Sequence, residues 1–450
     1  MVENVSLQNY HPNYNTIGVK SVSNSPIENK LSKVNFGKGV DNNISSMPIS
    51  APVSIRTTLN GKDENNKYTT IISNLDKTGR RVVDNLLKIG VLLNSQSDDN
   101  STVLDNLYKI VTEPRAKGLD STIILKDTIA TIAYPYIITQ QFGNIPESFR
   151  NIAEQANQDK NSSIDVSQSG TCVAASTEFK LANQNPAEFS RFAEGLSSEK
   201  MEVSKTLKLN NLADETLNAI WLLNAFDIDY NILDHFQTAK LIFKPDNNAI
   251  IRAQIQTVDK DKNERTPLDV LMQSTFMQVG SQQSYNTLTD KRSGKFNMNE
   301  KGLIEFEKTF TESVVFGKNI LSVMYQKIDD NAKLVGYETD LETTKKHITQ
   351  AIDEGENVLI GYTQTDANNV IINGHEITIV DYKTNKDGHV TFVCNDTDDN
   401  YSGAIEYPEE FIIPKIHHAA LPKHIVESDI SIKPSWVEGI EAFKEMKNVA

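Results

Sequence analysis

The chain has 450 residues, enough for about two or three domains, and carries 60 acidic against 45 basic side chains, a formal net charge of −15. An acidic balance argues against a nucleic-acid partner, because phosphate backbones bind basic side chains. Hydrophobic residues make up 38% of the chain. No apolar run reaches the roughly 18 residues that a membrane-spanning helix needs, so we expect no membrane contact.

Residues 1–65 are rich in Asn and Ser and show no apolar period. A segment that cannot bury apolar surface does not fold by itself, so we predict a disordered leader. The start at Met1 lacks the basic and apolar residues of a signal peptide. We therefore expect a cytoplasmic protein, or one exported by a route without a cleavable signal peptide.

Residues 66–158 show apolar side chains at helical spacing. Ser101 and Ser121 each stand before an apolar run, as residues that begin helices do, and Pro135 ends the second run. This pattern predicts a helical subdomain. Two roles are open for it: a packing domain, or an inhibitory pro-segment that lies over a cleft.

Cys172 follows a stretch of small, flexible residues, and a helical pattern starts at once. Ala175, Phe179 and Ala182 lie at spacings of four and three. Free amides at a helix N-terminus favour negative charge, so a thiol placed there ionises more readily than a free one. We predict a nucleophilic Cys172. The alternative is a small buried residue that packs a helix end.

Several further elements are predicted before the second motif. Residues 250–257 predict a strand, Thr266 is a natural N-cap for an amphipathic helix, and Thr339 or Asp340 starts another helix. Residues 281–300 predict an exposed loop.

The second motif is a predicted hairpin that His375 opens and Asn395 closes. Residues 385–388 end in Asp-Gly, which is a strong turn signal. His375 and Asn395 should therefore lie side by side, and an amide beside an imidazole orients it as a general base. Adjacent residues of a strand face opposite sides, so Cys394 should point away from this site, and we expect no disulfide.

The two motifs resemble the papain-like cysteine peptidase superfamily. Its pattern of Gly-His, a strand ending in Tyr, a turn and a second strand ending in Asn is matched by Gly374-His375, Tyr382 and Asn395. The resemblance implies an α+β, two-lobed fold. A helical lobe would carry the Cys, an antiparallel β lobe would carry the His and Asn, and the helical region would precede both.

The resemblance also implies a role for each site residue. Cys172 would be the nucleophile, His375 the base and Asn395 the residue that orients the base. The Cys172 amide and Gln168 would bind the oxyanion, although Gln168 lies four residues before the Cys and the family's Gln lies six before it. Asp396 is the alternative to Asn395, as in bacteriocin-processing relatives that use Asp.

The peptidase domain would span residues 159–425, with an insertion within about 185–335 and a C-terminal tail at 426–450. The implied function is a cysteine peptidase that hydrolyses a protein or peptide substrate through a thioester intermediate. A deamidase or transglutaminase-like enzyme would use the same thiol, and a catalytically inactive binding or structural protein is a third interpretation. We expect no cofactor and no metal, because His417-His418 and His424 lack partners at ligand spacing.

Overall fold

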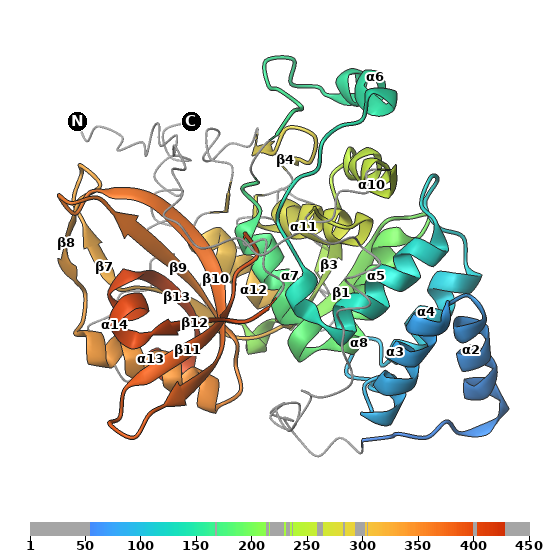
Figure 1. Ribbon diagram of the computed structural model, residues 1–450, viewed down its shortest axis with the longest axis horizontal. Helices are drawn as coiled ribbons and strands as arrows, with labels where there is room; N and C mark the ends of the chain where they lie inside the picture. The colour runs from blue at the N-terminus through green and yellow to red at the C-terminus, as the bar shows by residue number, and fades with distance from the viewer. Residues whose placement is uncertain are drawn as a thin grey trace.

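The chain folds into a helical lobe and a lobe built on one large antiparallel sheet (Figure 1). The mixed α+β class predicted from the sequence is therefore confirmed. No helix of the described chain has the length and apolar character needed to cross a bilayer. The computed structural model describes residues 55–166, 169–212, 216, 229–230, 235, 237–258, 264–281, 284–292, 302–303, 305–398 and 403–427.

The helical lobe begins with helices from the predicted helical region. They are α2 (Gly61–Ser73), α3 (Lys77–Lys88), α4 (Val103–Thr112), α5 (Ser121–Ala133) and α6 (Glu147–Ala156). Side-chain caps set two of their starts. Thr102 forms a reciprocal capping box with Asp105 at α4, and Asp120 accepts backbone amides at α5. Each cap lies one residue from the Ser that the sequence pattern marked.

The rest of this lobe carries Cys172 on its first helix. Its helices are α7 (Cys172–Gln184), α8 (Pro186–Ser197), α10 (Ala249–Val258), α11 (Pro267–Gly280) and α12 (Glu305–Phe316). A small antiparallel sheet joins β1 (Val203–Lys208), β3 (Thr238–Phe243) and β2 (Asp229–Tyr230) in that order. Buried side chains of these helices, of β1 and β3, and of α2 to α5 form one continuous core. The early helices therefore pack as part of the Cys172 lobe.

The predicted strand at residues 250–257 is wrong, because these residues lie in α10. The buried positions include Ala249, Arg252, Ala253 and Gln256, which recur at helical spacing. Two of these four side chains are polar, so hydrophobicity alone does not reveal the helical period. The apolar, β-branched residues between them favoured a strand instead.

Part of the predicted loop at 281–300 is also not exposed. The short strands β4 (Tyr285–Asn286) and β5 (Lys291–Arg292) pair as a hairpin, and Leu288 and Asp290 between them are fully buried. Polar composition predicted exposure here, but Asp290 is buried with hydrogen-bond partners. Residues 293–300 lie outside the described chain.

The second lobe is a sheet with the strand order β12-β11-β10-β9-β13-β6 and antiparallel neighbours throughout. Its strands are β6 (Ile320–Met324), β9 (Val358–Thr365), β10 (Ile371–Thr384), β11 (Val390–Asn395), β12 (Ile405–Pro408) and β13 (Ile416–Pro422). The predicted hairpin is formed by β10 and β11. A separate hairpin pairs β7 (Gln326–Ile328) with β8 (Leu334–Tyr337).

A second core joins this sheet to its own helices. These are α13 (Leu341–Asp353), α14 (Glu409–Ile412) and α15 (Lys423–Val426). Asp340 caps α13 and Thr266 caps α11, as the sequence predicts. α7 contacts β10 and α12 contacts β6, so the two lobes meet along these helices (Figure 1).

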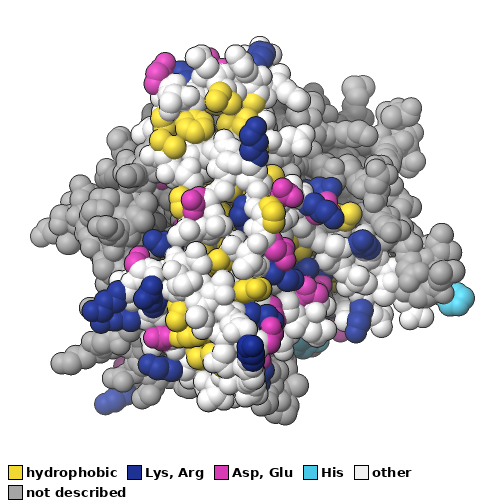
Figure 2. All heavy atoms as spheres, turned by 90° about the vertical axis from the view of Figure 1, so that its right-hand side faces the viewer, with side chains coloured by type: hydrophobic (Ala, Val, Ile, Leu, Met, Phe, Trp, Pro, Cys, Tyr) yellow, Lys and Arg dark blue, Asp and Glu magenta, His cyan; other side chains and the backbone are white. Residues whose placement is uncertain are grey.

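The chain ends bear on the predicted leader and tail. α2 begins at Gly61, inside the segment predicted to be disordered, while residues 1–54 and 428–450 lie outside the described chain. Figure 2 shows the face of the helical lobe that lies on the right of Figure 1. Acidic and basic side chains are interspersed over it, so the net negative charge is not gathered into one patch on this face.

Candidate active site

Cys172 is the first residue of α7, the helix that contacts β10 of the sheet lobe (Figure 1). Two buried side chains hold the loop that leads into it. Asp290 accepts the Gly170 amide at 2.6 Å, and Gln273 accepts the Thr171 hydroxyl at 3.0 Å. Cys172 itself is half-buried, which leaves part of the residue open to a reactant.

His375 and Asp396 lie beside each other in the sheet lobe. His375 is on β10 and Asp396 directly follows β11, and ring Nε2 donates to Asp396 Oδ1 at 2.7 Å. Each of the two side chains is 11% exposed. The Cys172 side chain interacts with the same ring and contributes to the raised pKa of His375. Cys172, His375 and Asp396 thus belong to one group of interacting side chains.

The electrostatics of this group favour a charged imidazole. Burial disfavours the imidazolium of His375, but the Asp396 carboxylate and then the Cys172 thiol outweigh it, so the pKa of His375 is raised well above its ordinary value. Burial also opposes ionisation of Asp396, but His375 and the Asp398 amide outweigh that effect and lower the pKa of Asp396. Both directions favour an imidazolium paired with a carboxylate.

Asn395 does not hydrogen-bond His375, contrary to the expectation from papain-like spacing. Asn395 pairs with Thr378 in the ladder between β10 and β11. Paired residues share a face of the sheet, and His375, three positions before Thr378, faces the other side. Asn395 is 1% exposed, and its Oδ1 has no hydrogen-bond partner in the described chain. Asp396, one residue further on, reaches the ring from beyond the strand end.

Cys394 shares the sheet face of His375, whereas the sequence analysis placed it on the opposite face. It pairs with Ile379, which lies an even number of positions from His375. Cys394 is completely buried in the second core with Ile377 and Ile379. Burial raises the pKa of its thiol well above the ordinary value. Both cysteines are free thiols.

The predicted oxyanion residue Gln168 lies outside the described chain. Within the described chain, the backbone N–H groups at the start of α7 are the candidates for binding an oxyanion. Backbone N–H groups in the first turn of a helix have no partner within that helix, and the macrodipole favours negative charge there. The Cys172 amide belongs to this turn.

Sequence reasoning missed two residues around this group. The ring of Tyr362 on β9 meets the His375 ring edge-on, with centroids 5.9 Å apart, because the two residues pair across the ladder. Gln140 follows the short helix η2 (Pro135–Ile137) and bonds Thr397, 257 positions away in sequence. Strand register decides the first contact and tertiary folding decides the second. Neither contact has a local signal in the sequence.

Glu376, next to His375, takes part in a buried charged cluster. Its Oε2 accepts from Lys308 on α12 at 3.0 Å and lies 3.5 Å from Nε2 of His418 on β13. Burial opposes ionisation of Glu376, but Lys308 and His418 outweigh it and lower its pKa to about 2. Within the described chain, no group of three or more His, Cys, Asp or Glu is arranged to hold a metal ion.

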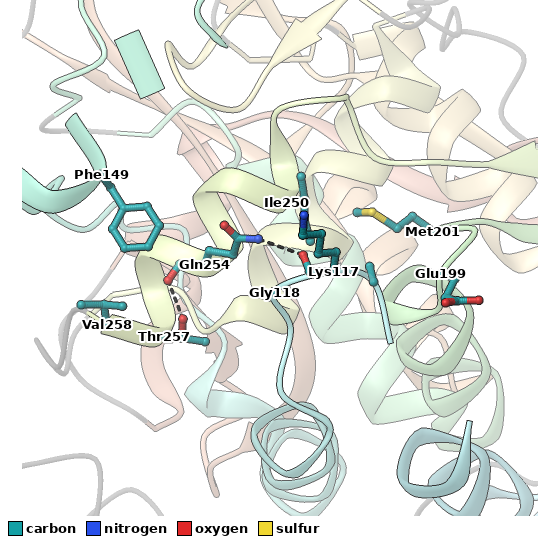
Figure 3. A pocket seen from close by; sticks show the side chains of 10 residues that line it. Lys117, Gly118, Phe149, Glu199, Met201, Ile250, Gln254, Thr257 and Val258 are labelled. Atoms are coloured by element: carbon teal, nitrogen blue, oxygen red, sulfur yellow. Dashed lines mark hydrogen bonds between the residues drawn. The ribbon is translucent and has the colours of Figure 1, made fainter. Parts of the chain in front are cut away.

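A surface hollow of about 700 Å³ lies elsewhere (Figure 3). Residues of α10 and of the loop around Gly118 line it. Gln254 of α10 donates to the Lys117 carbonyl of that loop at 2.9 Å and so joins the two segments. Cys172, His375 and Asp396 are not among its lining residues. This hollow is therefore separate from the candidate active site.

Comparison with known proteins finds no family model, no curated protein and no solved structure that matches this chain. Functional conclusions therefore rest on the residues of the chain itself.

Proposed function

We propose that the chain is a papain-like thiol hydrolase that cleaves amide bonds in a protein or peptide substrate. The observation that carries this proposal is that His375 hydrogen-bonds the Asp396 carboxylate at 2.7 Å and interacts with Cys172, which helps to raise the pKa of the ring. A base flanked by a nucleophile and an orienting acceptor is the arrangement used to activate thiols. A thiol at a helix start and a His on an antiparallel sheet also support the papain-like fold as part of the proposal.

In the proposed reaction, the Cys172 thiolate attacks the carbonyl carbon of the substrate amide, and His375 is already the imidazolium at this point. The Cys172 amide donates to the oxyanion that forms. His375 then gives its proton to the leaving nitrogen, the C–N bond breaks and a thioester remains. His375 next takes a proton from the water that attacks the thioester. The C–S bond then breaks, the acid product leaves, and the Cys172 thiolate and the His375 imidazolium are restored. Asp396 holds the ring and stabilises the imidazolium.

A panel of fluorogenic peptides tests the peptidase proposal. We expect turnover by the wild type and a loss on the order of 10³-fold or more in Cys172→Ala and in His375→Ala, because groups of one triad act as a unit. Cys394→Ala is the matched control, since it removes the other thiol and should retain turnover. A Cys172 that an iodoacetamide probe does not label would point instead to a catalytically inactive binding protein.

Deamidation or transglutaminase-like transfer is the second candidate. The specific observation that favours it is the carboxylate of Asp396 at the position that papain-like peptidases give to Asn. The acyl step would be the same, with the side-chain amide of Gln as substrate and ammonia as the leaving group. Ammonia release from a Gln-containing peptide, with the backbone left intact in a mass spectrum, would select this candidate over the peptidase.

A further inference from the structure

Residues 139–141, here called the bridging segment, run between the loop before Cys172 and the loop after Asp396. Gln273 joins the segment to the first loop, since its Nε2 donates to the Thr139 carbonyl at 2.9 Å and its Oε1 accepts from Thr171 at 3.0 Å. The segment meets the second loop through the Thr397 carbonyl, which accepts from the Gln140 amide at 3.0 Å. It therefore contacts the surroundings of both the nucleophile and the carboxylate.

Gln140 makes side-chain contacts to both loops, while Gln141 bonds only the second, where its Nε2 donates to the Asp398 carbonyl at 3.1 Å and to the Asp398 carboxylate. The Nε2 of Gln140 donates to Asp398 Oδ1 at 3.2 Å and lies 3.4 Å from the Ser169 carbonyl. Its Oε1 accepts from the Thr397 hydroxyl at 3.0 Å. Gln140 is 4% exposed and Thr397 is fully buried, so water does not compete freely for these bonds.

The loop held by Gln140 in turn holds Asp396. The Asp398 amide donates to Asp396 Oδ1 at 2.9 Å, and this is the oxygen that accepts from His375. The ladder of β11 ends at Asn395, so no strand pairing fixes Asp396 or the two residues after it. Their position depends on contacts from outside the sheet.

We propose that Gln140 is a positioning residue that holds Asp396 in register with His375, by fixing Thr397 and Asp398 relative to the loop before Cys172. This inference rests on the proposed function of the Cys172–His375–Asp396 group. Gln140 acts through Asp396 and does not touch the reacting atoms, so its removal should matter only while the Asp396 carboxylate is present.

A double-mutant cycle on the full chain tests this dependence. Gln140→Ala is made in the wild type and in Asp396→Asn, and the pKa of His375 is read from ring NMR signals of histidine-labelled protein. We expect Gln140→Ala to lower that pKa by about one unit in the wild type and to leave it unchanged in Asp396→Asn. The rate of Cys172 alkylation by iodoacetamide at about pH 6 should fall roughly tenfold in the wild-type background alone.

Gln278→Ala is the matched control. Gln278 is also a buried Gln, and its Nε2 donates to the Tyr285 carbonyl at 3.0 Å; the Tyr285 hydroxyl in turn donates to Asp290, not to the loop after Asp396. It should change neither readout. Gln140→Glu keeps the chain length and the acceptor for Thr397 while it removes the donor, so it replaces Gln140→Ala in the cycle if the alanine variant does not fold.

Equal effects of the Gln140 substitution in both backgrounds would overturn the inference, because they would show a role independent of Asp396. An unchanged His375 pKa in a folded Gln140 variant would overturn it as well. Failure of the proposed function is a different result: wild-type Cys172 would then react no faster than a free thiol in an unstructured peptide. The NMR titration judges Gln140 even in that case.

Discussion

Asn395 and Asp396 are the two candidates for the residue that orients His375. A carboxylate in that role affects the imidazole differently from an amide. The Asp396 carboxylate raises the pKa of His375, so the imidazolium persists to higher pH than an Asn partner would allow. Asp396→Asn should lower turnover on the order of 10²- to 10⁴-fold and move the alkaline limb of the rate profile to lower pH. A pH series of kcat/KM with a fluorogenic substrate measures both effects.

Asn395→Ala is the control for that series. It removes a buried side chain on the opposite sheet face, so it should keep the alkaline limb in place even if it costs some stability. Circular dichroism on both variants separates folding from chemistry. A dead Asn395 variant beside an active Asp396 variant would return the orienting role to Asn395.

The two cysteines should differ strongly in reactivity. Cys172 is half-buried beside His375, whereas Cys394 is completely buried and the pKa of its thiol is raised. We expect iodoacetamide to modify Cys172 roughly a hundredfold faster than Cys394 at slightly acidic pH. A mass-spectrometric time course measures the two rates. Equal rates would show that Cys172 is an inert structural thiol.

At the scale of elements, β10 is tied to α12 and β13 by the cluster around Glu376. The pKa of Glu376 is lowered from 4.5 to about 2, so the anion stabilises the fold fully above about pH 4.5, and this contribution is lost as pH falls towards 2. Glu376→Gln should therefore cost on the order of 3 kcal/mol near neutral pH, and the difference from wild type should shrink below about pH 4.5.

Thermal unfolding at several pH values between about 3 and 7 measures this difference. Glu406→Gln is the matched control, since Glu406 pairs with Lys383 at the surface with half of its side chain exposed. A surface pair contributes little, so that variant should follow the wild type at every pH. A Glu376→Gln effect that stays constant with pH would contradict the ionic origin of the stabilisation.

Elements with local signals were predicted well from the sequence, and elements without them were not. Thr266 and Asp340 cap helices in the structure, and residues 385–388 lie in the turn between β10 and β11, because caps and turns depend on neighbours in sequence. The helix α10 was missed because Arg252 and Gln256 occupy its buried face. Burial of such side chains depends on partners far away in the chain, such as the Gly143 carbonyl that Arg252 contacts.

The same limit explains how much of the candidate site could be foreseen. Cys172 was singled out because it opens a helical pattern, and His375 because it precedes a hairpin pattern; the structure places Cys172 first in α7 and His375 inside β10. The assignment of Asp396 over Asn395 needed the register of β10 against β11, in which Thr378 and not His375 stands opposite Asn395. A one-residue change of register exchanges the faces of all side chains, and sequence alone does not fix it.

At the scale of the whole molecule, buried charges join the two lobes. Lys180 on α7 lies against Glu312 on α12 and 3.5 Å from Glu356, which precedes β9 of the sheet lobe. The side chains of Lys180 and Glu312 are each only 1% exposed. Lys180→Met leaves Glu312 without its cation, and a buried charge without a partner costs about 3–5 kcal/mol.

Chemical denaturation measures that cost. Lys383→Met is the control, because its exposed pair with Glu406 should contribute less than about 1 kcal/mol. We expect the Lys180 variant to lose stability in both lobes, seen as a shift of the whole transition. A loss no larger than that of the control would show that the buried charges do not couple the lobes.

Cys394 is buried in the second core, so a reagent reaches its thiol only after the surrounding strands have separated. The rate at which this thiol is labelled therefore depends on how often the sheet opens around it. When reclosing is fast, the labelling rate of Cys394 under native conditions, divided by the labelling rate of a thiol in an unfolded peptide, is the equilibrium constant for opening. That constant gives the free energy of separating the strands around Cys394. The two free thiols therefore report different properties: Cys172 reports the chemistry of the candidate active site, and Cys394 reports how often the sheet opens.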